Sequence, residues 1–334
     1  MADRILAGHG SGGKLMNEMI GGLIRRVLGP ESVQLDDSAV LSVGAARIAF
    51  TTDTFTITPI EFPGGTIGSL AVNGTVNDLA MMGARPLYLS CALILEEGLE
   101  TAVLERILVS MRGAADYAGV SIVTGDTKVV PKGSADGIFI NTSGIGRVEA
   151  AATPSPERIA DGDCVLVSGP VGNHGMAVML SRAEFSFDFD LQSDSASVWP
   201  LVEKLLTLGS GLKFLRDPTR GGIAATLNEI ASMTGKGVVV DESSIPLDRS
   251  VVAASEMLGI DPLQAANEGK IVAVVERTLA DRALKLLSDS PLGNGAAIIG
   301  EVVSGGPSRV VMTTRVGGSR ILAEPSGELL PRIC

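Results

Sequence analysis

Residues 51–90, "TTDTFTITPIEFPGGTIGSLAVNGTVNDLAMMGARPLYLS", decide the fold of the first half of the chain. The run "RIAFTTDTF", which leads into this stretch, is rich in β-branched and aromatic residues and predicts a strand. "PLYLSCALIL", at its end, predicts a second strand, and the spacing of small and apolar residues over 66–82 predicts a helix between them. A strand, a helix and a strand in succession indicate a mixed α/β domain.

The same alternation continues outward from this stretch. A helix is expected at 101–118, followed by strands at "VSIVTGD" and "GIFINTSGIG". Around 150–163 the periodicity disappears and two prolines occur, which is typical of a domain boundary. We therefore expect an N-terminal domain over 1–150 and a C-terminal domain over 151–315.

The second half repeats the α/β pattern. Helices are expected at 219–233, 248–258 and 278–288, between strands such as "CVLVSGPVG" and "KIVAVV". Asp217 and Pro218 are typical of a helix start, and Ile223, Leu227 and Ile230 would form the buried face of the first of these helices. Residues 316–334 contain three glycines and two prolines and predict a flexible tail.

Composition excludes several classes of protein. The 334 residues are 45% hydrophobic, yet no apolar run reaches the length of about 18 residues that a membrane span needs. The first residues lack the pattern of a secretory signal, which predicts a cytoplasmic protein. A formal charge of −11 with 3% aromatic residues argues against nucleic acid as a partner.

The three cysteines show no metal-binding or disulfide pattern. Cys91 and Cys164 lie in apolar, strand-like runs and are expected to be small buried residues. Cys334 is the last residue of the sequence, in "LLPRIC", and has no such surroundings. Composition alone gives this thiol no role.

Aspartates interrupt apolar segments at four places: Asp37 in "DDSAVL", Asp53 within a strand, Asp78 on the apolar face of the 66–82 helix, and Asp126 after a strand. A buried carboxylate needs a partner. Each of these residues alone is explained by a turn or a helix cap, but together they predict a site for Mg²⁺ and phosphate, since hard cations take oxygen ligands.

Other polar residues are ambiguous from the sequence alone. "GHGSGGK", which contains His9, could wrap phosphate but is not a Walker motif, and "SGPVGNHG", with His174, lacks the dinucleotide spacing. Both glycine segments are expected to be flexible turns, although His174 could equally be a polar residue at the start of a helix. Lys128, two residues after Asp126, is either a surface lysine or a phosphate partner, and Glu268 is expected in a turn between a helix and a strand.

Seven motifs occur in order along the chain: "HGSGGKLMNEMI", "DDSAVL", residues 51–90, "TGDTKVV", "RDPTRGGIAATLNEIA", "ANEGK" and the terminal "PRIC". With them the sequence resembles the HypE family of hydrogenase maturation factors, in the superfamily of aminoimidazole ribonucleotide synthetase, selenophosphate synthetase and thiamine-monophosphate kinase. The resemblance implies a two-domain α/β fold of the aminoimidazole ribonucleotide synthetase type. It also implies a homodimer in which the N-terminal, ATP-binding domains pair their sheets into a barrel.

The resemblance further implies an enzyme, an ATP-dependent carbamoyl dehydratase. In this family HypF loads a carbamoyl group onto the terminal cysteine, and the S-carbamoyl group is dehydrated to a thiocyanate with release of ADP and phosphate. The cyano group then passes to iron on a HypC–HypD complex and becomes a cyanide ligand of [NiFe]-hydrogenase. A small-molecule kinase or synthetase of the same superfamily, or a non-catalytic assembly factor, are the alternatives.

Matching motifs carry the family's roles onto this sequence. Asp37, Asp53, Asp78 and Asp126 would hold Mg²⁺ and the phosphates of ATP, and Asp217, Arg220, Gly12 and Gly13 would complete the nucleotide site. Cys334 would carry the reacting group, with Lys128, Glu268 and His9 as catalytic residues. The superfamily's "GGDT" reads "TGDT" here, and the glycine loop lacks the reactive cysteine expected of a selenophosphate synthetase.

Overall fold

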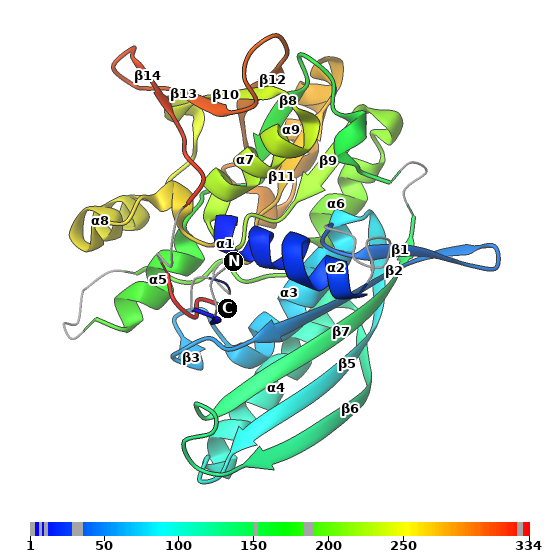
Figure 1. The fold of residues 1–334 in the computed structure, drawn as a ribbon, viewed down its shortest axis with the longest axis vertical. Coiled ribbons are helices and arrows are strands. Elements are labelled where there is room, and N and C mark those ends of the chain that lie inside the picture. The colour runs from blue at the N-terminus through cyan, green and yellow to red at the C-terminus, as the bar shows by residue number, and fades with distance from the viewer. Residues whose placement is uncertain are drawn as a thin grey trace.

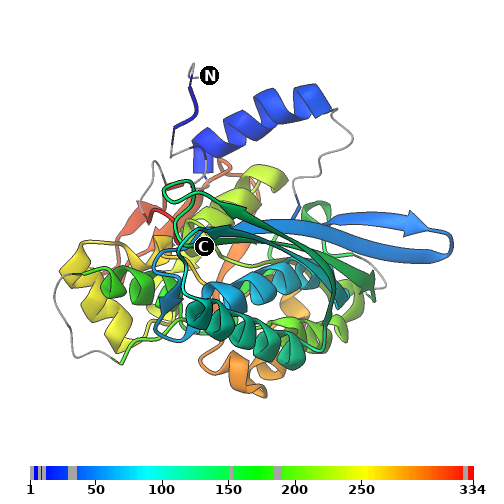
Figure 2. The ribbon, with the colours of Figure 1, turned by 90° about the horizontal axis from the view of Figure 1, so that it is seen from below.

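The computed structural model describes residues 4–6, 9, 13–28, 36–149, 153–183, 190–325 and 330–334. Two large sheets organise them: five strands in the first half, in the order β1-β2-β7-β5-β6, and seven in the second, in the order β14-β13-β10-β12-β8-β11-β9. A third, two-stranded sheet pairs β3 (Glu61–Phe62) with β4 (Gly65–Thr66). The C-terminus lies near the middle of the molecule, between the two halves, in both views (Figures 1 and 2).

The N-terminal sheet consists of β1 (Ala39–Val43), β2 (Ala46–Phe55), β5 (Ala84–Glu96), β6 (Ser121–Val130) and β7 (Ile138–Val148). Its pairings are antiparallel except between β5 and β6, which run parallel and are joined by α4 (Thr101–Ala118). Helices α3 (Ile67–Met81) and α4 cover one face of the sheet (Figure 2). The strand, helix and strand predicted from residues 51–90 are confirmed.

Helix α3 is defined at its start by a capping box. The hydroxyl of Thr66 accepts the amides of Gly68 and Ser69, and the Ser69 hydroxyl accepts the Thr66 amide. In the first turn of α3, Gly68 allows α4 to approach, because a Cβ there would lie 2.4 Å from the main-chain oxygen of Ile107. This close contact fixes α3 beneath the sheet, with Asp78 in its last turns.

The other face of the N-terminal sheet is not covered by these helices. Phe50, Ile145 and Tyr88 are register neighbours on three adjacent strands and are 43%, 40% and 51% exposed. Strand β6, at the edge, is exposed along almost its whole length. This open face is therefore a row of apolar side chains beside an unpaired edge.

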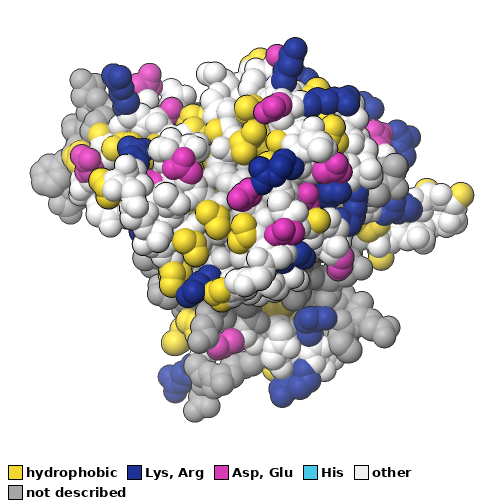
Figure 3. Space-filling model, turned by 90° about the horizontal axis from the view of Figure 1, so that it is seen from above, with side chains coloured by type: hydrophobic (Ala, Val, Ile, Leu, Met, Phe, Trp, Pro, Cys, Tyr) yellow, Lys and Arg dark blue, Asp and Glu magenta, His cyan; other side chains and the backbone are white. Residues whose placement is uncertain are grey.

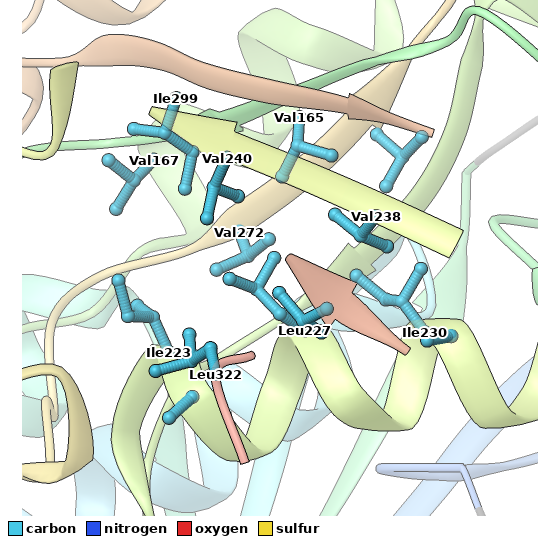
Figure 4. Close-up of a cluster of buried hydrophobic side chains, with 14 of the residues drawn as sticks. Val165, Val167, Ile223, Leu227, Ile230, Val238, Val240, Val272, Ile299 and Leu322 are labelled. Atoms are coloured by element: carbon cyan, nitrogen blue, oxygen red, sulfur yellow. The ribbon is translucent and has the colours of Figure 1, made fainter. Parts of the chain in front are cut away.

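The C-terminal sheet is built around a valine-rich core (Figure 4). Its strands are β8 (Cys164–Val167), β9 (Leu212–Arg216), β10 (Gly237–Asp241), β11 (Val272–Val275), β12 (Ala297–Val303), β13 (Val310–Thr313) and β14 (Ser319–Ile321). Helix α7 (Gly222–Thr234) packs against this sheet through Ile223, Leu227 and Ile230, all fully buried, as the spacing predicted.

The start of α7 differs from the prediction. The helix begins at Gly222, after Gly221, and both glycines have positive φ, of 59° and 79°. A Cβ on Gly222 would lie 2.5 Å from the main-chain oxygen of Ala265. The tight turn delays the helix, so Asp217 and Pro218 belong to the preceding loop and Asp217 is not its cap.

The remaining helices complete the two halves. Helices α8 (Arg249–Leu258) and α9 (Ala280–Ser288) lie where they were expected. The sequence interpretation missed α1 (Gly13–Met19), the π-helical turn η2 (Ile20–Ile24), α2 (Arg25–Leu28), α5 (Asn173–Ser181) and α6 (Trp199–Leu206). "SGPVGNHG" is therefore not a flexible turn, because its last residues open α5.

The prediction of a flexible tail over 316–334 is wrong for part of that segment. Strand β14 pairs with β13, and Leu322 is 1% exposed within the C-terminal core. Ile333 and Cys334 join the apolar cluster under the N-terminal sheet. Glycines and prolines indicate that a segment is not helical, but they do not exclude docking of its apolar residues.

Acidic and basic side chains are interspersed over the face shown in Figure 3. Among the described residues, every helix is too short or too polar to cross a membrane. Cys91 and Cys164 are buried in apolar clusters, as predicted.

Candidate active site

A cavity of about 310 Å³ lies where the two halves meet. Its walls come from β2, α3, the loop before α7, the segment before β11 and the end of the chain. The lining residues are Met16, Asp37, Thr51, Thr52, Asp53, Gly74, Asp78, Asp217, Thr219, Arg220, Glu229, Glu268 and Cys334. Six residues predicted from the sequence, plus Cys334, therefore share one cavity.

Three carboxylates form the acidic floor of this cavity. Asp37, Asp78 and Asp217 each present an oxygen, and these atoms lie within 4.8 Å of one another. The hydroxyl of Thr51 lies 2.9 Å from the Asp78 carboxylate and 2.9 Å from the main-chain oxygen of Asp37, so it links two of the segments that meet here.

Arg216 is the counter-charge of this acidic floor. Its guanidinium donates a short hydrogen bond to Asp37 and lies 3.3 Å from the Glu229 carboxylate, while the residue as a whole is 7% exposed. A buried cation of this kind stabilises the carboxylates beside it and would itself be costly without them.

The acidic floor is short of positive charge despite Arg216. Burial, followed by the charge of Asp37, raises the pKa of Asp217 to about 8. Burial and the neighbouring aspartates raise the pKa of Asp78 well above its ordinary value, and burial also raises that of Asp53. Oxygen ligands that repel one another in this way fit a hard divalent cation, which would relieve the repulsion.

Cys334 lines the same cavity. Its sulfur accepts a hydrogen bond of 2.9 Å from Nε of Arg220, and the residue is 8% exposed. Burial raises the pKa of the thiol to about 12; Arg220 opposes this shift, while Glu268 and Asp53 add to it. The docked thiol is thus held protonated in the resting chain.

Glu268 is the buried carboxyl in this cavity that is best suited to accept a proton. It is 3% exposed, and its Oε1 has no hydrogen-bond partner among the described residues. Burial, then the charges of Asp217 and Asp53, raise its pKa well above the ordinary value. A carboxyl whose pKa is raised by its surroundings suits general acid–base chemistry.

A second cavity of about 560 Å³ adjoins the first and shares Asp37, Asp217 and Arg220 with it. Its lining also includes Asn228 and Met233 of α7 and Ile20 of η2. A volume of this size is typical of sites for ligands as large as a nucleotide.

Asp126 and Lys128 do not join the site within one chain. They form an exposed ion pair of 2.6 Å on β6. The register aligns Asp126 with Thr54, through Ala92 and Asn141. Thr54 and Asp53 are adjacent on β2 and point to opposite faces, so Asp126 belongs to the open face of the sheet and Asp53 to the cavity.

The glycine loop is only partly described. His9 is 4% exposed, its Nδ1 accepts the Leu6 amide at 3.0 Å, and it is not among the residues that line either cavity. Gly13 is the first residue of α1, and Gly12 lies outside the described residues. Their roles at a nucleotide therefore stay predictions.

Several lining residues were missed from the sequence. Thr51 and Glu229 look like ordinary strand and helix residues, and no pattern distinguishes them. Arg216 had a possible signal, because it stands beside Asp217 at the end of an apolar strand. Its role depends on a contact with Asp37, 179 positions away in the chain.

Comparison with known proteins identifies the family to which this architecture belongs. Family models described as AIR synthase related protein match residues 35–148 (N-terminal domain) and 160–313 (C-terminal domain). The carbamoyl dehydratase HypE of Rhizobium leguminosarum bv. viciae is 48% identical over 333 residues, which is 99% of this chain and 95% of that protein.

Two solved structures show the same likeness. The HypE of a HypE–HypF complex has a TM-score of 0.85 and 48% identity, covering 91% of this chain and 100% of that one. A hydrogenase maturation protein HypE in complex with ATP has a TM-score of 0.84 and 47% identity, covering 99% and 100%. The chain therefore belongs to the AIR synthase related family and, within it, to the HypE proteins.

Proposed function

We propose that this protein is an ATP-dependent carbamoyl dehydratase whose substrate is a carbamoyl group on its own Cys334. The observation that carries the proposal is the position of the Cys334 sulfur, in one cavity with Glu268 and the acidic floor. Relatives that are 48% identical over nearly the whole chain bear the name carbamoyl dehydratase HypE.

The reaction converts R–S–C(=O)NH₂ and ATP into R–S–C≡N, ADP and phosphate. The carbamoyl oxygen attacks the γ-phosphorus, so that the oxygen leaves carbon as part of phosphate. Both protons on nitrogen are lost as the C≡N bond forms. Phosphoryl transfer of this kind depends on positioning and on neutralising charge, which suits a buried site with fixed cations and carboxylates.

The chain's own residues supply these functions. Oε1 of Glu268, which has no hydrogen-bond partner within the described part of the chain, would take a proton from the carbamoyl nitrogen. Arg220 Nε, now on sulfur, would stabilise charge that develops on the thiocarbamate. Asp37, Asp78 and Asp217 would hold Mg²⁺, which when bound neutralises phosphate charge, and the larger cavity would hold the nucleotide.

We further propose that the active form is a homodimer joined through the open face of the N-terminal sheet. Phe50, Tyr88 and Ile145 form an exposed apolar row there, and Asp126 and Lys128 lie on the same face. Pairing of two such faces would cover the apolar row and could bring Lys128 to the partner's site.

Loading and delivery require other proteins. A HypE of 48% identity has been crystallised with HypF, which supports HypF as the protein that carbamoylates Cys334. A HypC–HypD complex is proposed as acceptor of the cyano group, destined for the iron of [NiFe]-hydrogenase. Because Cys334 is 8% exposed, the tail must leave the cavity for either exchange.

The test is intact-mass measurement of the carbamoylated protein. Incubation with Mg²⁺ and ATP should lower its mass by one water and release ADP and phosphate in equal amounts. Nucleotide binding without any mass change would refute the proposal. Cys334→Ala should bind ATP normally and form no product, whereas a small-molecule kinase would retain turnover in this variant.

A further inference from the structure

The last residues of the chain are held through main-chain oxygens, and the Arg332 side chain also donates to the main-chain oxygen of Thr56 and to Asp136. The carbonyls of Pro331, Arg332 and Ile333 each accept a hydrogen bond from a side chain of α5 or its C-terminal neighbour. The main-chain oxygen of Cys334 accepts the Thr56 amide at 3.1 Å. Four consecutive main-chain oxygens are therefore bound by the body of the protein.

Arg182, directly after α5, binds two of these carbonyls at once. Its Nη1 donates to Pro331 and its Nη2 to Arg332, both at 2.7 Å, while its Nε donates to the main-chain oxygen of Thr58, also at 2.7 Å. The rigid guanidinium thus joins the tail to the loop that follows β2, which a lysine could not do in the same geometry.

His174, in the first turn of α5, binds the third carbonyl. Its Nε2 lies 2.8 Å from the oxygen of Ile333, and its Nδ1 lies 2.8 Å from the hydroxyl of Ser193. A carbonyl can only accept, so Nε2 carries the proton, and Nδ1 accepts from Ser193. The ring is fully buried, and this network fixes its orientation.

The two contacts stand on either side of a bend at Arg332. Among the described residues this is the only non-glycine with positive φ, at 48°. The left-handed conformation is unfavourable for a non-glycine residue and persists where the surroundings fix it. The bend turns the chain so that Ile333 enters the apolar cluster and the sulfur of Cys334 faces the cavity.

We propose that Arg182 and His174 form a docking site for the C-terminal segment and act as positioning residues for Cys334, by binding the main-chain carbonyls on both sides of the bend at Arg332. Docking itself is a property of the resting chain. The consequence for catalysis rests on the proposed function, because it concerns a group attached to the Cys334 sulfur.

Docking is tested by the reactivity of the Cys334 thiol in the full chain, without nucleotide or metal. Iodoacetamide is added, and peptides containing Cys91, Cys164 and Cys334 are followed by mass spectrometry. Arg182→Met should label at Cys334 about tenfold faster than wild type, since charge-assisted hydrogen bonds are lost. Arg112→Met, which removes an exposed arginine of α4, should label at the wild-type rate.

His174 allows a sharper test, because its two nitrogens have different partners. Gln places an amide near the position of Nε2 and Asn near that of Nδ1. His174→Gln should therefore retain slow labelling of Cys334, whereas His174→Asn and His174→Phe should label about tenfold faster. Equal rates for Gln and Asn variants would refute a specific role for the Ile333 contact.

Unfolding is distinguished from undocking by the two internal cysteines. Faster labelling of Cys91 and Cys164 as well would mark a variant as unfolded. If the His174 variants unfold, Arg182→Met, at a partly exposed position, decides whether the docking site exists. Rapid labelling of Cys334 in the wild-type protein, or slow labelling in folded Arg182→Met, would overturn the docking site.

The positioning role is tested with carbamoylated protein. Arg182→Met and His174→Asn should lower the rate of water loss while the KM for ATP stays at the wild-type value, and His174→Gln should recover most of the rate. The labelling differences could be found although neither the wild-type protein nor any variant loses water. That result would support the docking site and refute the proposed function.

Discussion

Replacing Asp217 by Asn should make the metal-free protein more stable while weakening its response to divalent cations. Asp217 is 7% exposed and lies with Asp37 and Asp78 in a group whose oxygens are within 4.8 Å of one another. At that separation two charges repel by about 3 kcal/mol with an effective dielectric constant of about 20. Arg216 keeps Asp37 and Glu229 as partners in the variant, so no buried cation is stranded.

The sign and size follow from the pKa of Asp217, which is raised from 3.8 to about 8. Between these values the folded chain keeps a proton that the unfolded chain has released, so wild-type stability falls as the pH rises towards 8. The full shift corresponds to about 6 kcal/mol, but Asp37 and Asp78 share the protons. We expect the variant's advantage to grow by about 2 kcal/mol between pH 5 and pH 8.

Thermal unfolding at pH 5 and pH 8, with and without Mg²⁺, measures this effect. A gain of about 2 kcal/mol raises the Tm by about 5 °C for a domain of this size. Mg²⁺ should raise the Tm of the wild-type protein at pH 8 more than that of Asp217→Asn. Asp116→Asn, in an exposed ion pair with Arg112, is the control and should change little at either pH. A lower Tm for Asp217→Asn at pH 8 without cation would refute the reasoning.

Three further predictions concern packing and catalysis. Gly68→Ala should lower the Tm by several degrees, since its Cβ would lie 2.4 Å from a main-chain oxygen of α4, whereas Gly113→Ala, with open space around it, should be neutral or stabilising; equal Tm values would contradict this. Glu268→Gln should bind ATP like wild type but lose water from carbamoylated protein at least about 100-fold more slowly, and an unchanged rate would exclude it as the base. If Lys128 acts across a dimer, mixing inactive Lys128→Ala and Cys334→Ala chains should restore about a quarter of wild-type product, and no recovery after confirmed subunit exchange would refute action across the interface.

The sequence predicted the fold most successfully where local pattern and tertiary structure agree. Residues 51–90 form β2, α3 and β5 as the alternation of periods indicated, and α7 buries the predicted face. The start of α7 was misplaced because two positive-φ glycines, required by a distant carbonyl, override a good capping sequence. Short apolar helices such as α5 and α6 give too little periodicity to be recognised.

The site was predicted in its acidic groups but not in its geometry. Asp37, Asp53, Asp78 and Asp217 were named from motifs and lie in one cavity. Asp126 was grouped with them, yet the register of β6 puts it on the other face of the sheet, and register depends on pairing that a single sequence does not reveal. The partners of the tail were missed for the same reason.

Because the tail is tethered to the body, its docking site need not be strong. Twelve positions separate Leu322 in the core from Cys334, and tethering over so short a length keeps the end of the chain at an effective concentration of about the millimolar range. A docking site whose dissociation constant is about equal to that concentration would be occupied half the time, and it would release the tail rapidly. The few hydrogen bonds from Arg182 and His174 thus suit a segment that must dock again each time it has reacted on another protein. A higher affinity would slow release of the tail and therefore slow turnover.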